Sequence, residues 1–533
     1  MTGKITDLPI FQCFRYRTID PNEKKFIFVN SDGSDETVTM GDIFTQTNRL
    51  SHALLKAGIG KGDCFTILMR NHPEFLYALF AALSIGAVAV PIDPRSKGDK
   101  LAFQINNTRS KGILVSDEFV ESLKDIEKCI TSAKVVGVLY KKHHNIEMIK
   151  EYPSLNDILI NENISLPSKV VPFDPKNPVQ IIHTSGTTGD PKGVVLRGER
   201  FRSYGILNKM VWRYKTDDIP YTGLSMTHGN SQSVTVFPVL SQKNTHAVIG
   251  EKFTKSQIWD ICRKYNCTTF SLLGGMMAGI FNEPHRPDDK HNPVRMVISA
   301  GTPTAIWEEF EARFNVKIFE WYAAVEGGMA YKRPGKGPVG SFGKPNILMY
   351  RMKIVDEQDR EVPPGAKGEL ISKLTFGKTS VDYFGKKKDS SDKTRGGWLR
   401  SGDICHRDKN GYLFFDFRVG GGLRRQGDFI QPDVVEKIIG KDESVSEVCV
   451  YGISASSGAP GESDIVAAVA PFNGKTLDVE RLKTACLNGL EKNAIPSYLQ
   501  IVSDIPKTIS EKPLSRLLKD SFRPDAENVI KFQ

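Results

Sequence analysis

The densest group of residues able to bind phosphate lies between Thr184 and Gly193. This ten-residue segment contains four hydroxyl side chains, three glycines and one lysine, Lys192. Glycines allow backbone N–H groups to converge on an anion, hydroxyl groups add donors, and Lys192 supplies a positive charge. We interpret the segment as a loop that holds nucleotide phosphates, the alternative being a polar surface loop. It differs from the GxxxxGK[ST] loop because Pro191 replaces the second glycine.

Short apolar segments predict strands on both sides of this loop, at residues 179–183 and 194–196. The chain around it alternates between helical and strand patterns, which is typical of parallel sheets covered by helices. The clearest helix is 39–58, whose apolar positions repeat with helical spacing up to a terminal glycine. Further expected elements are strands at 64–69, 112–115, 135–140 and 268–273 and a helix at 253–265.

The character of the sequence changes after residue 337. Strand patterns at 350–355 and 368–373 are joined by polar and proline-containing turns, which predicts a smaller β-rich subdomain. Three consecutive glycines at 420–422 form a flexible connector, and helix and strand patterns beyond it predict a compact α+β domain. The expected fold class is α/β, with an N-terminal domain (1–418, split into α/β subdomains at 1–337 and a β-rich subdomain at 338–418), a hinge (419–422) and a small mobile C-terminal lid domain (423–533).

The composition is that of a soluble globular protein, with 40% hydrophobic and 25% charged residues. The net charge is +10, but lysines and arginines are spread along the chain, which argues against a nucleic-acid partner. We interpret the two densest basic runs, residues 141–142 and 386–388, as solvated loops. The excess positive charge instead suits anionic substrates such as nucleotides.

The eight cysteines are scattered and form no CxxC pair, which indicates reduced, buried thiols in a cytoplasmic protein. We expect no signal peptide at the N-terminus and no targeting address at the C-terminus. The uncharged run 75–92 approaches membrane-spanning length but contains Ser84, Gly86 and Pro91. We therefore expect a buried helix at 73–83, a glycine turn and a short strand, with no transmembrane segment.

The loop from Thr184 to Gly193 resembles the signature of the adenylate-forming (AMP-binding) superfamily, which includes acyl-CoA synthetases, luciferases and adenylation domains of peptide synthetases. Further motifs of that superfamily follow in order, and the resemblance extends from Thr37 to Arg516. The segments at 322–328 (YAAVEGG) and 510–512 (SEK) are similar to the branch of crotonobetaine, fatty-acid-transport-type and bile-acid CoA ligases. The resemblance implies an AMP-forming carboxylate–CoA ligase that uses ATP, Mg²⁺ and coenzyme A.

The resemblance implies a nucleotide site built from several separate motifs. Tyr322 would stack on the adenine, and Glu326 and Thr184 would bind magnesium, for which hard oxygen ligands are suitable. Asp403 and Arg418 would hold the ribose, since a carboxylate can accept two hydrogen bonds at once. The implied nucleotide-binding residues are Thr184, Ser185, Gly186, Thr187, Thr188, Gly189, Lys192, Ala300, Gly301, Thr302, Trp321, Tyr322, Ala323, Asp403 and Arg418.

Other motifs imply the acyl pocket, the path of coenzyme A and the catalytic groups. Arg424 and Gly427 would line the coenzyme A path, and Gly420 would be the hinge. Lys512 is the implied catalytic lysine, with Lys507 as the alternative; it would act with Lys192 and Glu326 on the charge that develops at the α-phosphate. The acyl pocket would contain His228, Gly274, Gly275, Met276 and Met277, with Ala300 and Ala323 beside them, which favours a neutral acyl group of appreciable size.

Three positions depart from the usual pattern of the superfamily. Val325 replaces a threonine whose hydroxyl group usually holds the phosphate, Gly420 stands where an aspartate or lysine is commoner, and Phe429 replaces a frequent arginine. These departures favour one alternative, a nucleotide-binding pseudo-enzyme, whereas the retained lysines and carboxylates argue against it. A second alternative is an adenylation enzyme that loads a separate carrier-protein thiol. The identity of the carboxylic acid, and whether the chain is a monomer or a homodimer, are left open.

Overall fold

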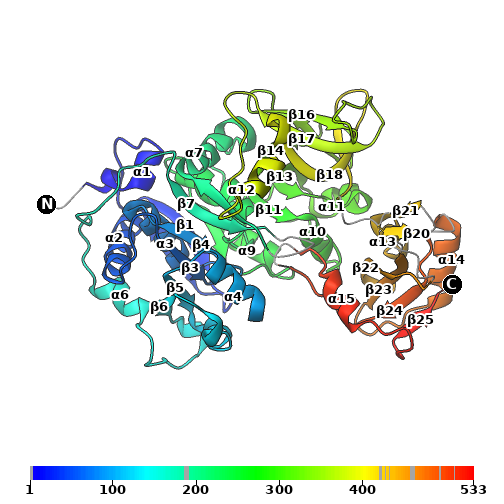
Figure 1. The fold of residues 1–533 in the computed structure, drawn as a ribbon, viewed down its shortest axis with the longest axis horizontal. Helices are drawn as coiled ribbons and strands as arrows, with labels where there is room; N and C mark the ends of the chain where they lie inside the picture. Colours follow the sequence, from blue (N-terminus) through cyan, green and yellow to red (C-terminus); the bar gives the residue numbers. More distant parts are fainter. Residues whose placement is uncertain are drawn as a thin grey trace. The chain divides into compact units, whose positions relative to one another are not determined.

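The computed structural model describes residues 4–184, 191–418, 423–425, 428–430, 432–456, 463–490, 494–508 and 511–532. The chain forms two compact units, and each is described here by itself (Figure 1). Unit 1 consists of Met1–Arg351 and Ser372–Leu399, and unit 2 of Met352–Ile371 and Arg400–Gln533. The domain boundaries expected from the sequence remain a prediction.

The first sheet of unit 1 has six strands in the order β6-β5-β3-β4-β7-β8. All neighbouring pairs are parallel except β7 and β8, which form an antiparallel hairpin. Every residue of β3, β4 and β5 is buried, as expected for parallel strands covered on both faces. The strands are β3 (Cys64–Leu68), β4 (Val88–Pro91), β5 (Gly112–Ser116), β6 (Lys134–Leu139), β7 (Pro178–His183) and β8 (Gly193–Arg197).

Two helices, α2 (Met40–Lys56) and α3 (Pro73–Ile85), pack against each other beside this sheet (Figure 1). Helix α2 begins with a capping box in which Thr39 and Asp42 satisfy each other's backbone N–H groups. Helix α3 is buried at every residue and ends at Gly86, whose φ of 71° turns the chain into β4. The predicted helix, glycine turn and strand are therefore confirmed. None of the described helices is long and apolar enough to cross a bilayer.

In unit 1, the second sheet runs in the order β15-β14-β13-β12-β11-β9-β10-β1-β2. The strands from β13 to β1 pair in parallel, and the strands at the two ends pair antiparallel. They are β1 (Lys24–Val29), β2 (Asp35–Thr39), β9 (Pro220–Thr222), β10 (Ala247–Gly250), β11 (Thr269–Leu273), β12 (Met296–Ala300), β13 (Lys317–Ala324), β14 (Gly327–Lys332) and β15 (Ser341–Pro345).

The remaining helices of unit 1 cover these two sheets and their connections. One prediction is wrong in its start: the helix expected at 253–265 begins only at Ile258, because the preceding residues close a turn from Gln257 to Thr254. The helices are α1 (Pro9–Cys13), α4 (Gly98–Asn107), α5 (Val120–Lys124), α6 (Leu155–Asn161), α7 (Gly198–Leu207), α8 (Phe237–Leu240), α9 (Ile258–Lys264), α10 (Gly274–Phe281), α11 (Trp307–Phe314) and α12 (Lys387–Lys393).

Unit 2 contains a β-rich part and an α+β part. In the first, β16, β17, β18 and β19 are neighbours in that order; in the second, β22 to β25 form a four-stranded sheet whose core includes residues of α13 and α14. The predicted α/β fold with a small C-terminal α+β domain is confirmed. The elements are β16 (Tyr350–Val355), β17 (Gly368–Leu374), β18 (Leu399–Arg407), β19 (Leu413–Arg418), β20 (Leu423–Arg425), β21 (Asp428–Ile430), α13 (Pro432–Ile439), β22 (Val445–Ser454), β23 (Ser463–Pro471), α14 (Val479–Gly489), β24 (Tyr498–Ile501), α15 (Ser515–Ser521) and β25 (Val529–Lys531).

The structure corrects three smaller expectations about charged runs and thiols. Lys141 is not solvated: it is 9% exposed, and its Nζ lies 2.8 Å from Glu36 and 3.3 Å from Glu74. The basic run at 386–388 is not a plain loop either, since it enters the first turn of α12. Among the eight free cysteines, Cys129 is exposed and the others are buried.

Candidate active site

The predicted phosphate loop is closed at its base by Thr184 and Lys192. The hairpin of β7 and β8 places His183 opposite Gly193. Beyond this pair, the backbone N–H of Thr184 donates to the Lys192 carbonyl oxygen at 2.9 Å, and the Thr184 hydroxyl group donates to the same oxygen at 3.3 Å. The predicted contacts of Ser185, Gly186, Thr187, Thr188 and Gly189 fall outside the described residues and remain predictions.

The side chain of Lys192 makes two contacts with a segment almost two hundred residues further along the chain. Its Nζ lies 2.7 Å from Oδ2 of Asp389, in the first turn of α12, and 5.4 Å from the centre of the Tyr383 ring. The Lys192 hydrogen bond lowers the pKa of Asp389. Both charged side chains are partly exposed, at 42% and 36%, so this ion pair contributes little to stability. A phosphate could compete for the lysine.

Tyr383 connects Lys192 to the predicted metal ligand, Glu326. The tyrosine is buried at 4% exposure, and its hydroxyl group donates to Glu326 Oε1 at 3.0 Å. The backbone beside it is fixed, because Tyr383 bridges to Val194 and the next N–H group donates to the Gly193 carbonyl oxygen at 2.8 Å. One buried aromatic side chain thus contacts both residues that the sequence assigned to charge stabilisation.

Glu326 lies in the turn between β13 and β14, after Val325. The Val325 carbonyl oxygen accepts a hydrogen bond from Arg200 at 3.1 Å, and the Val325 side chain packs against an apolar cluster that includes Tyr383. The donor set proposed for magnesium, the Glu326 carboxylate and the Thr184 hydroxyl group, consists of hard oxygen atoms, which fits this ion. Val325 has an apolar role in place of the usual hydroxyl group.

The turn predicted to pass the adenine, Ala300 to Thr302, is held by a buried carboxylate. Gly301 has a φ of 79°, a conformation that favours glycine. Glu320 Oε1 accepts the backbone N–H groups of Gly301 and Thr302 at 2.8 and 3.2 Å, and its other oxygen contacts the Thr302 hydroxyl group. Burial raises the pKa of Glu320 to about 7, although these hydrogen bonds act in the opposite direction.

The first residue of the predicted acyl-pocket segment touches that same turn. A Cβ atom on Gly274 would lie 1.8 Å from the Gly301 carbonyl oxygen, so only glycine fits at the start of α10. Gly275 is exposed, whereas Met276 and Met277 are buried in an apolar core cluster. The structure therefore brings the predicted acyl and adenine segments together at Gly274, and it places the two methionine side chains in the core.

Strand β13 directs its predicted site residues to opposite faces, since side chains alternate along a strand. Trp321 is buried at 7% exposure and packs edge-on against Trp212, with ring centres 5.1 Å apart. Tyr322 is half-buried and lies against Phe342, and Ala323 is exposed. The nucleotide contacts of these three residues remain predictions.

His228 follows β9 in a compact turn of unit 1. Its backbone N–H donates to the Ser225 carbonyl oxygen at 2.9 Å, and its Nδ1 accepts the backbone N–H of Asn230 at 3.2 Å. Because Nδ1 is the acceptor in this contact, the proton of a neutral imidazole is placed on Nε2. The ring is half-buried. Its predicted place in the acyl pocket is not tested by these contacts.

In unit 2, the two residues predicted to hold the ribose lie opposite each other. Asp403 on β18 pairs in register with Arg418 on β19 in an antiparallel ladder. Asp403 is buried at 6% exposure, and its backbone N–H donates to the Ser401 hydroxyl group at 2.9 Å. The side chain of Arg418 falls outside the description. Pairing of the two backbones agrees with a shared role, which stays a prediction.

The predicted catalytic lysine, Lys512, is exposed and lies in a tight turn of unit 2. Its backbone carbonyl oxygen accepts the Thr508 N–H at 2.8 Å. Glu511, which occupies the position where the superfamily usually has glycine, takes a φ of 56°. Lys507, the alternative, forms ion pairs with Glu447 and Glu511. The hinge Gly420, Gly427 and the side chain of Arg424 lie outside the described parts of the chain.

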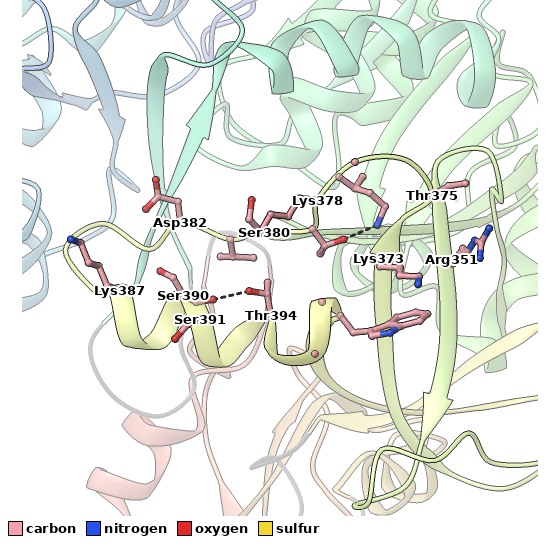
Figure 2. Close-up of a pocket in the computed structure, with 17 residues that line it drawn as sticks. Arg351, Lys373, Thr375, Lys378, Ser380, Asp382, Lys387, Ser390, Ser391 and Thr394 are labelled. Carbon is pink, nitrogen blue, oxygen red and sulfur yellow. Dashed lines mark hydrogen bonds between the residues drawn. The ribbon is translucent and has the colours of Figure 1, made fainter.

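A separate cavity of about 820 Å³ lies in unit 1 beside α12 (Figure 2). Lys387, Ser390, Ser391 and Thr394 line it from one face of the helix, at spacings of three and four residues. Asp389 is on the opposite face, by the 100° rotation per residue that an α-helix makes. Among the described residues, none that the sequence analysis assigned to the active site lines this cavity. Helix α12 thus separates it from Lys192.

Sequence reasoning missed three residues that organise this site: Tyr383, Asp389 and Glu320. Tyr383 and Asp389 are far in sequence from the residues they contact, and no local pattern marks them. Glu320 has a recognisable signal, because it is a single carboxylate between the aromatic residues of a buried strand. A charged residue in such a place is rarely buried without a partner.

Comparison with known proteins agrees with this fold and these motifs. Residues 17–375 match the AMP-binding enzyme family, and residues 434–512 match the AMP-binding enzyme C-terminal domain. The chain therefore belongs to the AMP-binding enzyme family, as its motifs indicated.

The related proteins include named CoA ligases. The chain is 27% identical over 508 residues to a crotonobetaine/carnitine–CoA ligase of Citrobacter koseri, covering 93% of this chain and 96% of that protein. It is also 27% identical over 528 residues to long-chain fatty acid transport protein 6 of Mus musculus, covering 94% and 83%. Among solved structures, an o-succinylbenzoate CoA synthetase from Bacillus subtilis, in complex with its acyl-adenylate intermediate, has the same fold (TM-score 0.78, 21% identity, 97% and 99% covered).

Proposed function

We propose that this protein is an ATP-dependent acid–thiol ligase that forms an acyl-adenylate and then transfers the acyl group to coenzyme A. Membership of the AMP-binding enzyme family supports the adenylating step. The observation that carries the proposal is the contact of Tyr383 with both Lys192 and Glu326. The names of the related ligases support coenzyme A as the acceptor. The carboxylic acid is not assigned.

In the first half-reaction, a carboxylate oxygen of the acid attacks the α-phosphorus of ATP. The bond from this phosphorus to the bridging oxygen breaks, and pyrophosphate leaves. Lys192 neutralises charge on the phosphate oxygens, and we assign the same role to Lys512; each such contact supplies about 3 kcal/mol. Magnesium held by Glu326 and Thr184 would add further positive charge beside the phosphates.

In the second half-reaction, the thiol sulfur of coenzyme A attacks the acyl carbon of the mixed anhydride. The carbon–oxygen bond to the phosphate breaks, AMP leaves, and the thiol proton passes to solvent. A thiol is intrinsically nucleophilic even where only a small fraction is ionised near pH 7. Correct positioning is therefore the main requirement of this step.

Exchange of labelled pyrophosphate into ATP tests the proposal when it is measured with a panel of acids. The panel includes short and long aliphatic, aromatic, trimethylammonium and steroid acids. We expect at least one acid to support exchange and, once coenzyme A is added, to yield its thioester by mass spectrometry. Nucleotide binding without exchange for any acid would instead indicate the pseudo-enzyme. Exchange with acylation only of a carrier protein would indicate the carrier-loading alternative.

A further inference from the structure

A buried cluster of histidines and carboxylates lies where the two sheets of unit 1 meet. His72 follows β3 at the start of α3, His144 lies in the short 3₁₀ helix η4 (Lys142–His144) after β6, and Glu251 follows β10. One ring nitrogen of each histidine and one oxygen of Glu251 all lie within 4.8 Å of one another. None of these residues has a role in the proposed adenylation reaction.

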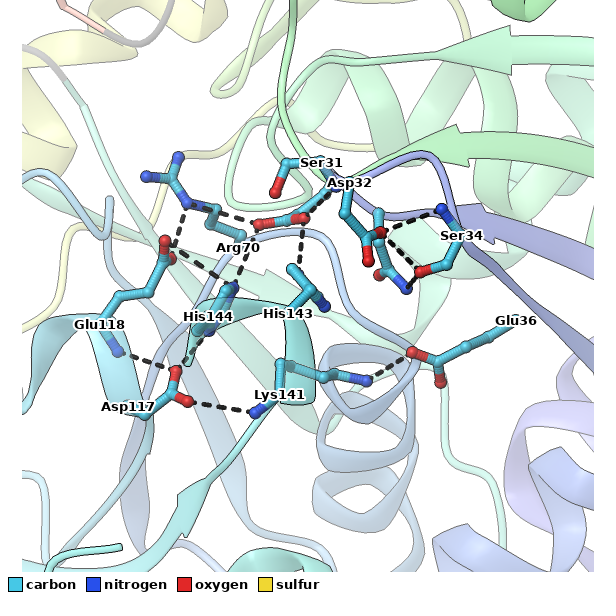
Figure 3. A network of polar contacts seen from close by, with 12 residues as sticks. Ser31, Asp32, Ser34, Glu36, Arg70, Asp117, Glu118, Lys141, His143 and His144 are labelled. Carbon is cyan, nitrogen blue, oxygen red and sulfur yellow. Dashed lines mark hydrogen bonds and ion pairs between the residues drawn. The ribbon is translucent and has the colours of Figure 1, made fainter. Parts of the chain in front are cut away.

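The orientation of His144 is fixed by Asp117 (Figure 3). His144 Nδ1 lies 2.5 Å from Asp117 Oδ1, and the Asp117 carboxylate also accepts the backbone N–H groups of Glu118 and Lys141 at 2.9 and 3.1 Å. An imidazole that donates from Nδ1 to a carboxylate presents a lone pair at Nε2, the arrangement common in metal-binding histidines. The His144 ring is thus prepared to act as a ligand through Nε2.

The Nε2 atom of His144 faces a carboxylate oxygen. It lies 3.4 Å from Glu251 Oε1. A lone pair and a carboxylate oxygen repel each other unless a proton or a metal cation lies between them. In a tetrahedral zinc site with ligand bonds near 2.1 Å, neighbouring ligand atoms are about 3.4 Å apart. The separation of these two atoms therefore fits two ligands of one ion.

His72 supplies a third ligand atom that has no other use. It is completely buried, and neither of its ring nitrogens has a hydrogen-bond partner within the described ranges. A buried polar group without a partner destabilises the folded state. Coordination of an ion would satisfy one nitrogen.

The surroundings of the cluster favour a cation and hold Glu251 in place. Glu251 Oε2 accepts the Ser31 N–H at 2.6 Å and lies 3.1 Å from His143 Nε2. Its Oε1 lies 3.4 Å from His144 Nε2 and 3.8 Å from Nε of Arg70. Leaving Glu74 aside, four carboxylates outnumber two basic side chains in the network. The carboxylates are Glu36, Asp117, Glu118 and Glu251, and the basic residues are Arg70 and Lys141.

We propose that His72, His144 and Glu251 bind one Zn²⁺ ion, with a water molecule in the fourth position and Asp117 as the positioning residue of His144. Two imidazoles and one carboxylate suit zinc, whereas magnesium prefers oxygen ligands throughout. The ion would connect β3 and β6 of the first sheet to β10 of the second sheet, and so act as a structural crosslink within unit 1.

Metal analysis of tag-free protein tests this site. We expect about one zinc per chain after dialysis, a lower melting temperature after treatment with a zinc chelator, and visible bands of four-coordinate cobalt when Co²⁺ replaces zinc. His72→Gln, His144→Gln and Glu251→Gln should each lose the metal. Asp117→Asn should retain the fold but bind zinc about 10- to 100-fold more weakly.

His52→Gln is the matched control, because His52 bonds the Ser165 carbonyl oxygen outside the cluster; it should keep its zinc. The wild-type protein alone decides the question if the variants do not fold. Substoichiometric zinc, the absence of cobalt bands at saturating Co²⁺, or zinc retained by the His72 and His144 variants would each overturn the proposal.

Discussion

The hydroxyl group of Tyr383 donates a hydrogen bond to Glu326 at 3.0 Å, while the ring of the same tyrosine faces the ammonium group of Lys192 at 5.4 Å. The predicted metal ligand and the predicted phosphate ligand are therefore positioned by one buried side chain. Tyr383 contacts neither reacting group of the substrates in our account. We regard it as a positioning residue.

Tyr383→Phe should impair adenylation without unfolding the protein. The change keeps the ring beside Lys192 but removes the donor to a charged carboxylate, an interaction worth about 1.5–3 kcal/mol. We expect kcat/KM for ATP in pyrophosphate exchange to fall about 10- to 100-fold and the magnesium requirement to rise. Tyr265→Phe is the control, because Tyr265 also donates to a carboxylate, that of Asp35. If both variants lower kcat/KM for ATP equally, Tyr383 has no specific positioning role.

Asp389→Asn should improve ATP binding. The ion pair with Asp389 competes with phosphate for Lys192, and a partly exposed pair of this kind is worth up to about 1 kcal/mol. We expect the KM for ATP to fall about two- to fivefold at low salt, with the difference narrowing as salt is added. Asp382→Asn, which breaks the exposed pair with Arg197 instead, should leave the KM unchanged. A raised KM in the Asp389 variant would contradict the competition.

Glu320→Gln should change how stability depends on pH. The pKa of Glu320 is raised from 4.5 to about 7 in the folded protein, so the folded state binds more protons than the unfolded state between these values. The free energy of unfolding therefore falls as pH rises through this window, by roughly 3 kcal/mol. Glutamine mimics the protonated acid, since it can accept from Gly301 and donate to Thr302.

Denaturant unfolding at several pH values measures this effect. The variant should match the wild type near pH 4.5 and exceed its stability near pH 8 by roughly 3 kcal/mol. Subtracting the two curves cancels the contributions of other titrating groups. A difference that is constant with pH would show that Glu320 is ionised throughout.

Lys512→Ala should separate the two half-reactions. Lys512 is assigned to groups that are present only during adenylation, so pyrophosphate release should fall at least about 100-fold. Conversion of supplied acyl-adenylate to the thioester should continue. Lys507→Ala is the comparison, because Lys507 is already paired with Glu447 and Glu511. Loss of both half-reactions in the Lys512 variant, or of neither, would make the assignment wrong.

Much of the fold could be predicted because its signals are local. The helix of 73–85, the glycine at 86 and the strand that follows are encoded by proline, apolar residues and glycine in direct succession. The family motifs likewise lie within short segments, and the register of Asp403 with Arg418 agrees with their predicted common role. The predicted start of α9 was wrong because turn and helix patterns are similar at helix ends.

The remaining features could not be predicted, because they depend on contacts between segments that are distant in the sequence. Tyr383 is 57 positions from Glu326, and Asp389 is on a helix that the sequence presented only as a basic run. His72, His144 and Glu251 meet because three strands end near one another, which spacing alone does not reveal. Burial, too, follows from tertiary packing, as Lys141 illustrates.

The fate of oxygen-18 from a labelled carboxylic acid tests the central claim most directly. If a carboxylate oxygen attacks the α-phosphorus and the thiol later attacks the acyl carbon, one labelled oxygen must leave with AMP. We therefore predict that mass spectrometry finds a single ¹⁸O atom in the AMP formed during thioester synthesis with an accepted acid. Label in inorganic phosphate, or AMP free of label, would contradict an acyl-adenylate and with it the proposed function.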